Sequence, residues 1–303
     1  MAHPIDLDDE APAPPAPAPA PPVSVPSVLV PPAPAPTAPV PELPDTSRLD
    51  NAVWAALDGP HAHLAERAGR AARYPADVYD FAALADPADP AAWDDLHTLV
   101  GPGTTVRLKP ADDVPDGWQV MGRGTAVQLV GTALRTEPAP EAVRLGPADV
   151  PEILDLVART RPGPFLGRTV ELGAYLGIRH RGRLVALAGE RVRGPGWTEI
   201  SAVCTDPGHR GRGLGTRLVR AVADGIRERG DRPFLHAAAD NTPAIRLYEA
   251  IGFTVRRRAT LLQVRSPGTP PEGRTPGAPE RYGTHRRPDP RHASDGSRRA
   301  GRA

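Results

Sequence analysis

Ile200-Ser-Ala-Val-Cys-Thr-Asp-Pro-Gly-His-Arg-Gly-Arg-Gly-Leu-Gly-Thr216 carries a β-type run straight into a glycine-rich turn. The turn opens into a helix, because the apolar residues Leu214, Leu218, Val222 and Ile226 recur at helical spacing. The first amides of a helix have no partner inside it, and the helix dipole favours negative charge at that end. The segment therefore predicts a backbone site for a pyrophosphate.

The turn fits the pattern Arg/Gln-x-x-Gly-x-Gly/Ala from Arg210 to Gly215. Its glycines let the backbone approach a ligand and adopt positive φ without a Cβ clash, and its arginines could add charge-assisted hydrogen bonds. A Walker loop needs Gly-Lys-Ser/Thr, but the only lysine of the chain is Lys109. A dinucleotide fingerprint would need glycine where Thr216 stands. The alternative is that the segment is only a glycine-rich turn that connects a strand to a helix and binds no phosphate.

A second motif follows in Asn241-Thr-Pro-Ala-Ile-Arg-Leu-Tyr-Glu-Ala-Ile-Gly-Phe253. Asn241 or Thr242 is suited to cap a short helix, with proline in its first turn and glycine just past its end. Helical spacing places Asn241, Ala244 and Tyr248 on one face, as in a wall that contacts a ligand. The other face carries Leu247 and Ile251 and is expected to belong to the core.

Together, the two motifs resemble those of the GNAT superfamily of N-acyltransferases in order and in separation. The resemblance covers roughly residues 141–265, with motif A from Ile200 to Gly230 and motif B from Pro233 to Phe253. Motif B is most similar to the branch that includes the C-terminal domain of glycine N-acyltransferases. The resemblance implies an α/β GNAT fold, in which helices flank a mixed, mostly antiparallel sheet.

The resemblance also implies transfer of an acyl group, expected to be acetyl, from a coenzyme A thioester. The acceptor would be a primary amine of a small molecule or a peptide, which attacks the thioester directly in a ternary complex. No metal is expected. The alternative is a non-catalytic module that binds acyl-CoA and senses its level.

The reaction needs a base for the amine, a hydrogen-bond donor for the developing oxyanion and an acid for the departing thiolate. Glu199 is the first candidate for the base that takes a proton from the amine, although it could instead pair with a nearby arginine. Glu190 is the reserve candidate, and many family members rely on water chains. The resemblance assigns the amide of Val203 to the developing oxyanion and Tyr248 to protonation of the departing thiolate.

The residues that the resemblance assigns to the cofactor lie in three groups: the strand end, the turn and the second motif. They are Val203, Cys204 and Thr205, then Arg210, Gly211, Arg212, Gly213, Leu214, Gly215 and Thr216, then Asn241, Ala244 and Tyr248.

The sequence gives weaker evidence of a function for several other reactive side chains. Cys204 is the single cysteine, and inside an apolar strand it is expected to act as a small apolar residue rather than a nucleophile. His61 and His63 have no evident carboxylate partner for a metal site. Arg168 stands near the expected substrate groove, together with Thr169 and Glu171, and could hold the carboxylate of an amino-acid acceptor.

Amino-acid composition indicates what the ends of the chain are and which kinds of partner are not expected. Of its 303 residues 40 are proline, and residues 1–45 are proline- and alanine-rich, acidic and free of Lys and Arg. They predict a disordered tail, and residues 267–303 predict a second, basic one. No segment is long and apolar enough to span a bilayer, so a cytoplasmic protein is expected. Nucleic-acid binding is not expected, because the net charge is only +1 and the basic tail has little aromatic interleaving.

The middle of the chain is expected to form two parts, residues 46–140 and 141–266. The first would be an α/β lobe, either a degenerate acyltransferase-like half or a cap that helps to form the acceptor pocket. Its expected helices are 47–57 and 90–100, and its strands 105–108, 118–121 and 126–130. The second part is the GNAT domain, with strands expected over 142–145, 175–179, 184–193, 199–205, 233–236, 254–257 and 260–264. Besides the two motif helices, a helix is expected over 148–160.

Overall fold

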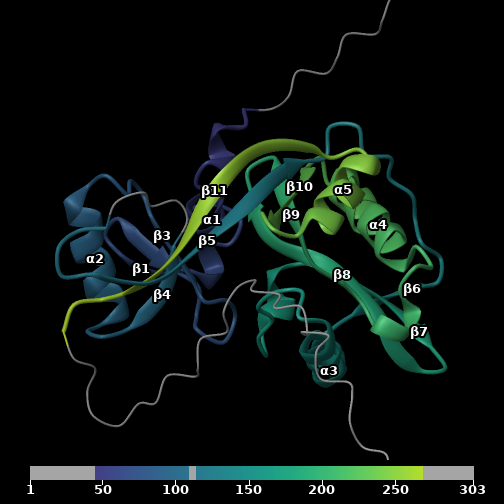
Figure 1. Ribbon diagram of the computed structural model, residues 1–303. Coiled ribbons are helices and arrows are strands. Elements are labelled where there is room, and N and C mark those ends of the chain that lie inside the picture. The colour runs from purple at the N-terminus through teal and green to yellow at the C-terminus, as the bar shows by residue number, and fades with distance from the viewer. Residues whose placement is uncertain (1–44, 109–113, 269–303) are drawn as a thin grey trace, which may run out of the picture. The chain divides into compact units, whose positions relative to one another are not determined.

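The computed structural model describes residues 45–108 and 114–268 (Figure 1). The chain divides into two units, residues 1–42 and Leu43–Ala303, and all described residues belong to the second. The expected tails, apart from Asp45, Pro267 and Gly268, lie outside the described residues. Within those residues no helix has the length and apolar character needed to cross a bilayer.

Eleven strands form one sheet, in the order β1-β2-β3-β4-β11-β5-β10-β9-β8-β7-β6. The strands are β1 (Glu66–Ala68), β2 (Ala71–Arg73), β3 (Phe81–Leu84), β4 (Thr105–Leu108), β5 (Gln119–Val130), β6 (Ala142–Leu145), β7 (Tyr175–His180), β8 (Arg183–Gly194), β9 (Trp197–Thr205), β10 (Arg232–Ala238) and β11 (Thr254–Arg265). The helices are α1 (Ala52–Leu57), α2 (Pro90–Val100), α3 (Val150–Thr160), α4 (Leu214–Glu228) and α5 (Thr242–Ala250). Among the described strands, only the β3–β4 and β9–β10 pairs are parallel. The sheet is therefore mixed and mostly antiparallel, as expected.

Helices cover both faces of the sheet around β8, β9 and β10 (Figure 1). Neighbouring residues of a strand point to opposite faces, and Phe234 and Leu235 of β10 belong to different core clusters. Leu235 packs in the cluster that contains the buried face of α4 and Tyr248 of α5. Phe234 packs in the cluster that contains Leu57 of α1. The sheet thus has α4 and α5 on one face and α1 on the other.

β5 lies inside the sheet rather than beside it. It pairs antiparallel with β10, where Phe234 faces Val130, and along its whole length with β11. β11 also pairs with β4. Residues 46–140 therefore contribute a central strand to the sheet of residues 141–266, and the boundary near residue 140 stays a prediction.

Most expected elements are present with similar bounds, and three expectations were wrong. Strands 118–121 and 126–130 are the single strand β5, and strands 254–257 and 260–264 are the single strand β11. Glycines interrupt the apolar pattern of β5, but its two partners hold it extended. The expected helix over 47–57 is a 3-10 turn, Ser47–Leu49, followed by α1, because the backbone of Asn51 leaves the helical region at φ −128° and ψ 60°. β1, β2 and β3 were not expected.

Candidate active site

The glycine-rich turn lies at the start of α4, as the sequence predicted. Gly213 is the residue before the helix, with φ +73°, and Gly211 has φ +76°. No heavy atom lies within 4 Å of the position that a Cβ would take at either glycine. Both glycines and the arginine between them are exposed. The turn is therefore open to solvent on the side where a ligand would approach.

The amides of this turn have no acceptor within the part of the chain that the structure describes. Outside helix and strand pairing, none of residues 211–216 donates a backbone hydrogen bond there. Side chains before the turn hold it in place. Asp206 accepts from the amide of Gly208 at 3.0 Å and from Nε of Arg159 at 3.2 Å. Nε of Arg210 donates to the carbonyl oxygen of Thr205 at 3.2 Å. A row of unpaired donors at a helix N-terminus fits an anion such as a diphosphate.

Next to the turn, β9 carries a bulge and parts from β10. Ala202 has φ +54°, and the register with β8 shifts between the pairs Leu187–Cys204 and Gly189–Ser201. A bulge leaves one residue out of the ladder and bends its strand. The pairing of β9 with β10 ends at Ile200 and Leu235. Beyond that point residues 201–205 pair with no described residue on the β10 side. We call this unpaired stretch between the two strands the slot.

Tyr248 of α5 is buried close to this slot. Its side chain is 8% exposed, and its ring packs edge-on against Phe253 at 5.9 Å. Burial, and secondarily the nearby Cys204 thiol, raise the pKa of Tyr248 to about 12. The phenol is therefore protonated at neutral pH, as a proton donor must be.

The rest of the second motif agrees in part with its expected arrangement. Asn241 caps α5, and its Oδ1 accepts from the amide of Ala244 at 3.3 Å. Leu247, which was expected in the core, is 42% exposed. That expectation was wrong because Tyr248, not Leu247, is the residue that α5 turns towards the sheet.

Cys204 is buried, as expected of a small apolar residue. Burial raises the pKa of its thiol to about 11 despite a hydrogen bond with Thr160 that acts to lower it. At neutral pH the side chain is a neutral thiol rather than a nucleophilic thiolate.

Glu199 makes a buried ion pair with Arg191 of β8. Its Oε2 accepts from Nε of Arg191 at 2.9 Å and its Oε1 from Nη2 at 2.7 Å. The carboxylate is only 1% exposed, and Oε1 also lies 2.6 Å from Nδ1 of His236. Burial acts to raise the pKa of Glu199, but Arg191 and then His236 outweigh it, so the pKa is lowered. The pairing with an arginine that the sequence left open is present.

The reserve candidate, Glu190, is also buried and paired. Its Oε1 accepts from Nη2 of Arg229 at 2.6 Å. Arg168 is exposed at the surface, where Glu171 binds it through two hydrogen bonds of 2.7 and 2.8 Å. Asp77 pairs with the same guanidinium at 3.3 Å. Arg168 is therefore not free to hold an acceptor carboxylate without giving up these partners.

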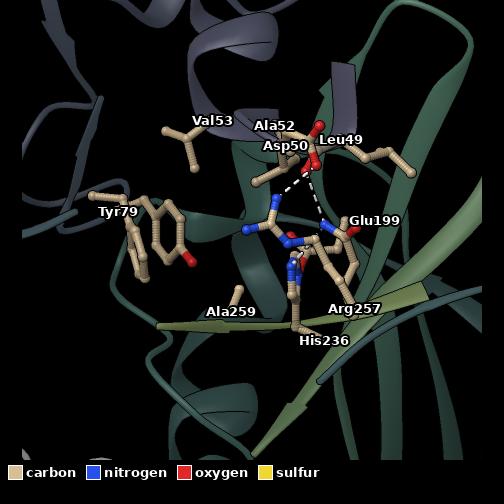
Figure 2. A pocket seen from close by; sticks show the side chains of 12 residues that line it. Leu49, Asp50, Ala52, Val53, Tyr79, Glu199, His236, Arg257 and Ala259 are labelled. Carbon is tan, nitrogen blue, oxygen red and sulfur yellow. Dashed lines mark hydrogen bonds and ion pairs between the residues drawn. The ribbon is translucent and has the colours of Figure 1, made fainter. Parts of the chain in front are cut away.

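A narrow pocket lies against Glu199 and His236, on the sheet face covered by α1. Figure 2 shows these two side chains close together, with Asp50 and Arg257 beside them and Tyr79 across the pocket. It leaves about 20 Å³ for the centre of a water molecule, which suits one or two waters. Its walls come from both expected parts of the chain.

Sequence reasoning missed the partners of Glu199. The sequence pattern did not mark His236, Arg191 or Gln128 as catalytic residues. The parallel pairing of β9 with β10 brings Glu199 and His236 together across 37 residues of sequence. The only signal in the sequence was the position of both residues on expected neighbouring strands.

Comparison with solved structures decides the family. A protein from Novosphingobium aromaticivorans, described as an acetyltransferase of the GNAT family, matches with a TM-score of 0.66 and 38% identity. The match covers 73% of this chain and 99% of that one. The chain belongs to the GNAT family. The superfamily resemblance and the fold class are thereby confirmed, whereas the glycine N-acyltransferase branch stays a prediction.

Sequence relatives agree with the GNAT assignment over shorter spans. The model of a family described as FR47-like protein matches residues 175–262, which run from β7 into β11. The N-alpha-acetyltransferase RimI of Mycobacterium tuberculosis is 38% identical over 90 residues, which are 28% of this chain and 56% of that protein. A mycothiol acetyltransferase of Corynebacterium glutamicum is 42% identical over 76 residues, 22% of this chain and 26% of that protein. This chain thus matches about half or less of the length of these curated relatives.

Proposed function

We propose that this GNAT protein transfers an acetyl group from acetyl-CoA to a primary amine. The observation that carries the proposal is the combination of unpaired amides at residues 211–216 with the slot between β9 and β10. The amides suit the diphosphate of coenzyme A. The unpaired edge of β9 suits the amide-containing pantetheine arm, which can add to it like a strand.

The residues around the slot supply two further needs of the reaction. The bulge leaves Ala202 and Val203 without a regular partner in β8. An amide aimed at the thioester oxygen would stabilise the charge that develops there, which is worth roughly 3–4 kcal/mol in comparable sites. Tyr248, protonated at neutral pH, would donate a proton to the departing thiolate.

The acceptor is expected to approach from the face of the sheet that carries Glu199. Glu199 as the base remains a prediction, and its ion pair with Arg191 makes the carboxylate a weak proton acceptor by itself. The panel of acceptors should include small primary amines and peptides with a free N-terminus, because both kinds remain open.

Release of the free thiol from acetyl-CoA in the presence of each amine tests the proposal. Tyr248→Phe should lower kcat by about 10²-fold, within the usual range for a lost general acid, and leave acetyl-CoA binding unchanged. Tyr175→Phe is the matched control, because Tyr175 is also buried and its hydroxyl has no hydrogen-bond partner among the described residues. Binding of acetyl-CoA without thiol release from any amine would favour the alternative, a sensor of acyl-CoA.

A further inference from the structure

A second cavity lies between α4 and the strands β6 and β7, which are neighbours at one end of the sheet (Figure 1). Its volume is about 300 Å³. That is enough for a small organic molecule, because ligand pockets begin at roughly 300 Å³. Among the described residues that line it, none belongs to β9, β10 or α5. The cavity is therefore separate from the slot and from the glycine-rich turn.

Ion pairs hold one wall of this cavity against α4. Nε of Arg217 lies 2.9 Å from Oε1 of Glu141, and Nη1 of Arg220 lies 3.5 Å from Oε2 of Glu137. Both arginines belong to α4, so the segment before β6 is tied to the helix at two points. Two residues between these glutamates line the cavity. Four of all its lining residues are alanines, whose short side chains leave the space between strands and helix unfilled.

A buried carboxylate with one free oxygen also lines the cavity. Glu190 of β8 is 5% exposed, and its Oε1 accepts from Nη2 of Arg229 at 2.6 Å. Its Oε2 has no donor among the described residues. A buried polar atom without a partner is costly, and a hydrogen bond from a ligand removes that cost. Because Glu190 lines the cavity, a ligand there can supply the missing donor.

Two further carboxylates, those of Asp224 and Glu228, form the helix wall of the cavity. They are four residues apart in α4, so both side chains lie on the same face of the helix. Neither makes an ion pair or a side-chain hydrogen bond with a described residue. Like charges at this spacing repel each other, and the C-terminal end of a helix attracts cations. The helix wall therefore favours a positively charged group such as an ammonium.

An arginine without a partner stands on the strand side of the cavity. Arg144 of β6 pairs in the sheet with Leu176, which packs against the core cluster that contains the buried face of α4. Residues paired across strands lie on the same face, so Arg144 is on the face that α4 covers. It makes no ion pair with a described residue, although the helix wall lines the same cavity. The opposite charges are too far apart to meet directly, and a ligand that carries both charges would bridge them.

We propose that this cavity binds a free amino acid, with its ammonium against Glu190 and the helix wall and its carboxylate against Arg144. The three donors of an ammonium match several carboxylate oxygens, and a planar guanidinium matches a carboxylate. The alanines of the lining suit an apolar side chain. The site goes beyond the proposed acetyl transfer and does not rest on it.

Amide spectra of the nitrogen-15-labelled full chain test the proposal on the wild type. Each proteinogenic amino acid is added at millimolar concentration. At least one with an apolar side chain should shift the signals of Ala142, Ala174 and Ala221 until saturation. For that amino acid, the amine that lacks the carboxylate and the acid that lacks the amino group should each bind at least about 10-fold more weakly, because each loses charge-assisted hydrogen bonds.

Two variants locate the two ends of the ligand. Asp224→Asn and Arg144→Gln should each weaken binding of the amino acid by about 10-fold. Asp224→Asn should leave the affinity for the acid unchanged, and Arg144→Gln should leave the affinity for the amine unchanged. Asp94→Asn is the matched control and should bind as the wild type does, because Asp94 is an exposed aspartate of α2 whose side chain has no described partner.

The proposal is overturned if no amino acid shifts the three alanine signals to saturation, or if the amine or the acid alone binds as tightly as the amino acid. Wild-type affinity in both Asp224→Asn and Arg144→Gln would overturn it as well. If either variant does not fold, the comparison of the three ligands on the wild type still decides. Binding is measured without acetyl-CoA, so a failure here leaves the proposed acetyl transfer untouched, and a failure of acetyl transfer leaves this site untouched.

Discussion

Replacing Gly213 with alanine separates the shape of the turn from its role in binding. Gly213 has φ +73°, in the left-handed region, and no heavy atom lies within 4 Å of the new Cβ. The cost is therefore conformational rather than steric, roughly 1–2 kcal/mol of the free energy of unfolding. Gly225→Ala is the control, because Gly225 lies within α4 and its Cβ would meet only Nη1 of Arg229 at 3.7 Å. That change should stabilise the protein by about 0.5–1 kcal/mol.

Urea unfolding of both variants measures these energies, and titration calorimetry measures acetyl-CoA binding. Gly213→Ala should be less stable and should bind acetyl-CoA more weakly, because the left-handed residue aims the amides that follow it. Gly225→Ala should be more stable and bind normally. An unchanged stability of Gly213→Ala would contradict the backbone conformation, and lower stability with full affinity would contradict the role of the turn.

Three further predictions concern other parts of the molecule. Cys204→Ala should keep the activity that releases thiol from acetyl-CoA. Alkylating reagents should leave Cys204 unmodified in the folded protein at neutral pH, because its thiol has a pKa of about 11. Rapid labelling coupled to inactivation would refute this. Burial, with His63 and Arg193 nearby, lowers the pKa of His61 from 6.5 to about 4, so the unfolded chain takes up its proton first. Stability should then fall by about 3 kcal/mol as the pH drops from 6.5 to 4, and the His61→Asn variant should show a flatter dependence in urea titrations at each pH. A fragment of residues 141–268 should not fold, because it lacks β5 between β10 and β11; a well-dispersed amide spectrum of the fragment would show otherwise.

Local motifs explain why the C-terminal half could be read from the sequence. The glycines around Arg212 and the cap at Asn241 specify their turns and helix starts through neighbouring residues alone. The helix α4 and the capped start of α5 follow from these signals, and so does the identification of the superfamily. Leu247 was misplaced because α5 is short, and spacing alone did not tell which of its faces meets the sheet.

Contacts between distant residues explain what the sequence could not show. The insertion of β5 depends on pairing with strands more than 100 residues later, and its glycines at 122 and 124 hide its continuity. The network of Gln128, His236 and Glu199 depends on that insertion. A buried ion pair between Glu199 and Arg191 could be guessed as one possibility, but only the register of β8 against β9 selects it.

Binding of the acetyl-CoA diphosphate by the amides from Gly211 to Thr216 is the step on which the proposed acetyl transfer depends. Amide chemical shifts of nitrogen-15-labelled protein, followed during titration with acetyl-CoA and separately with S-acetylpantetheine, test it most directly. The amide signals of Gly211, Gly213 and Gly215 should shift strongly with acetyl-CoA and change little with the analogue that lacks the diphosphate. Unmoved glycine amides at saturating acetyl-CoA would contradict it.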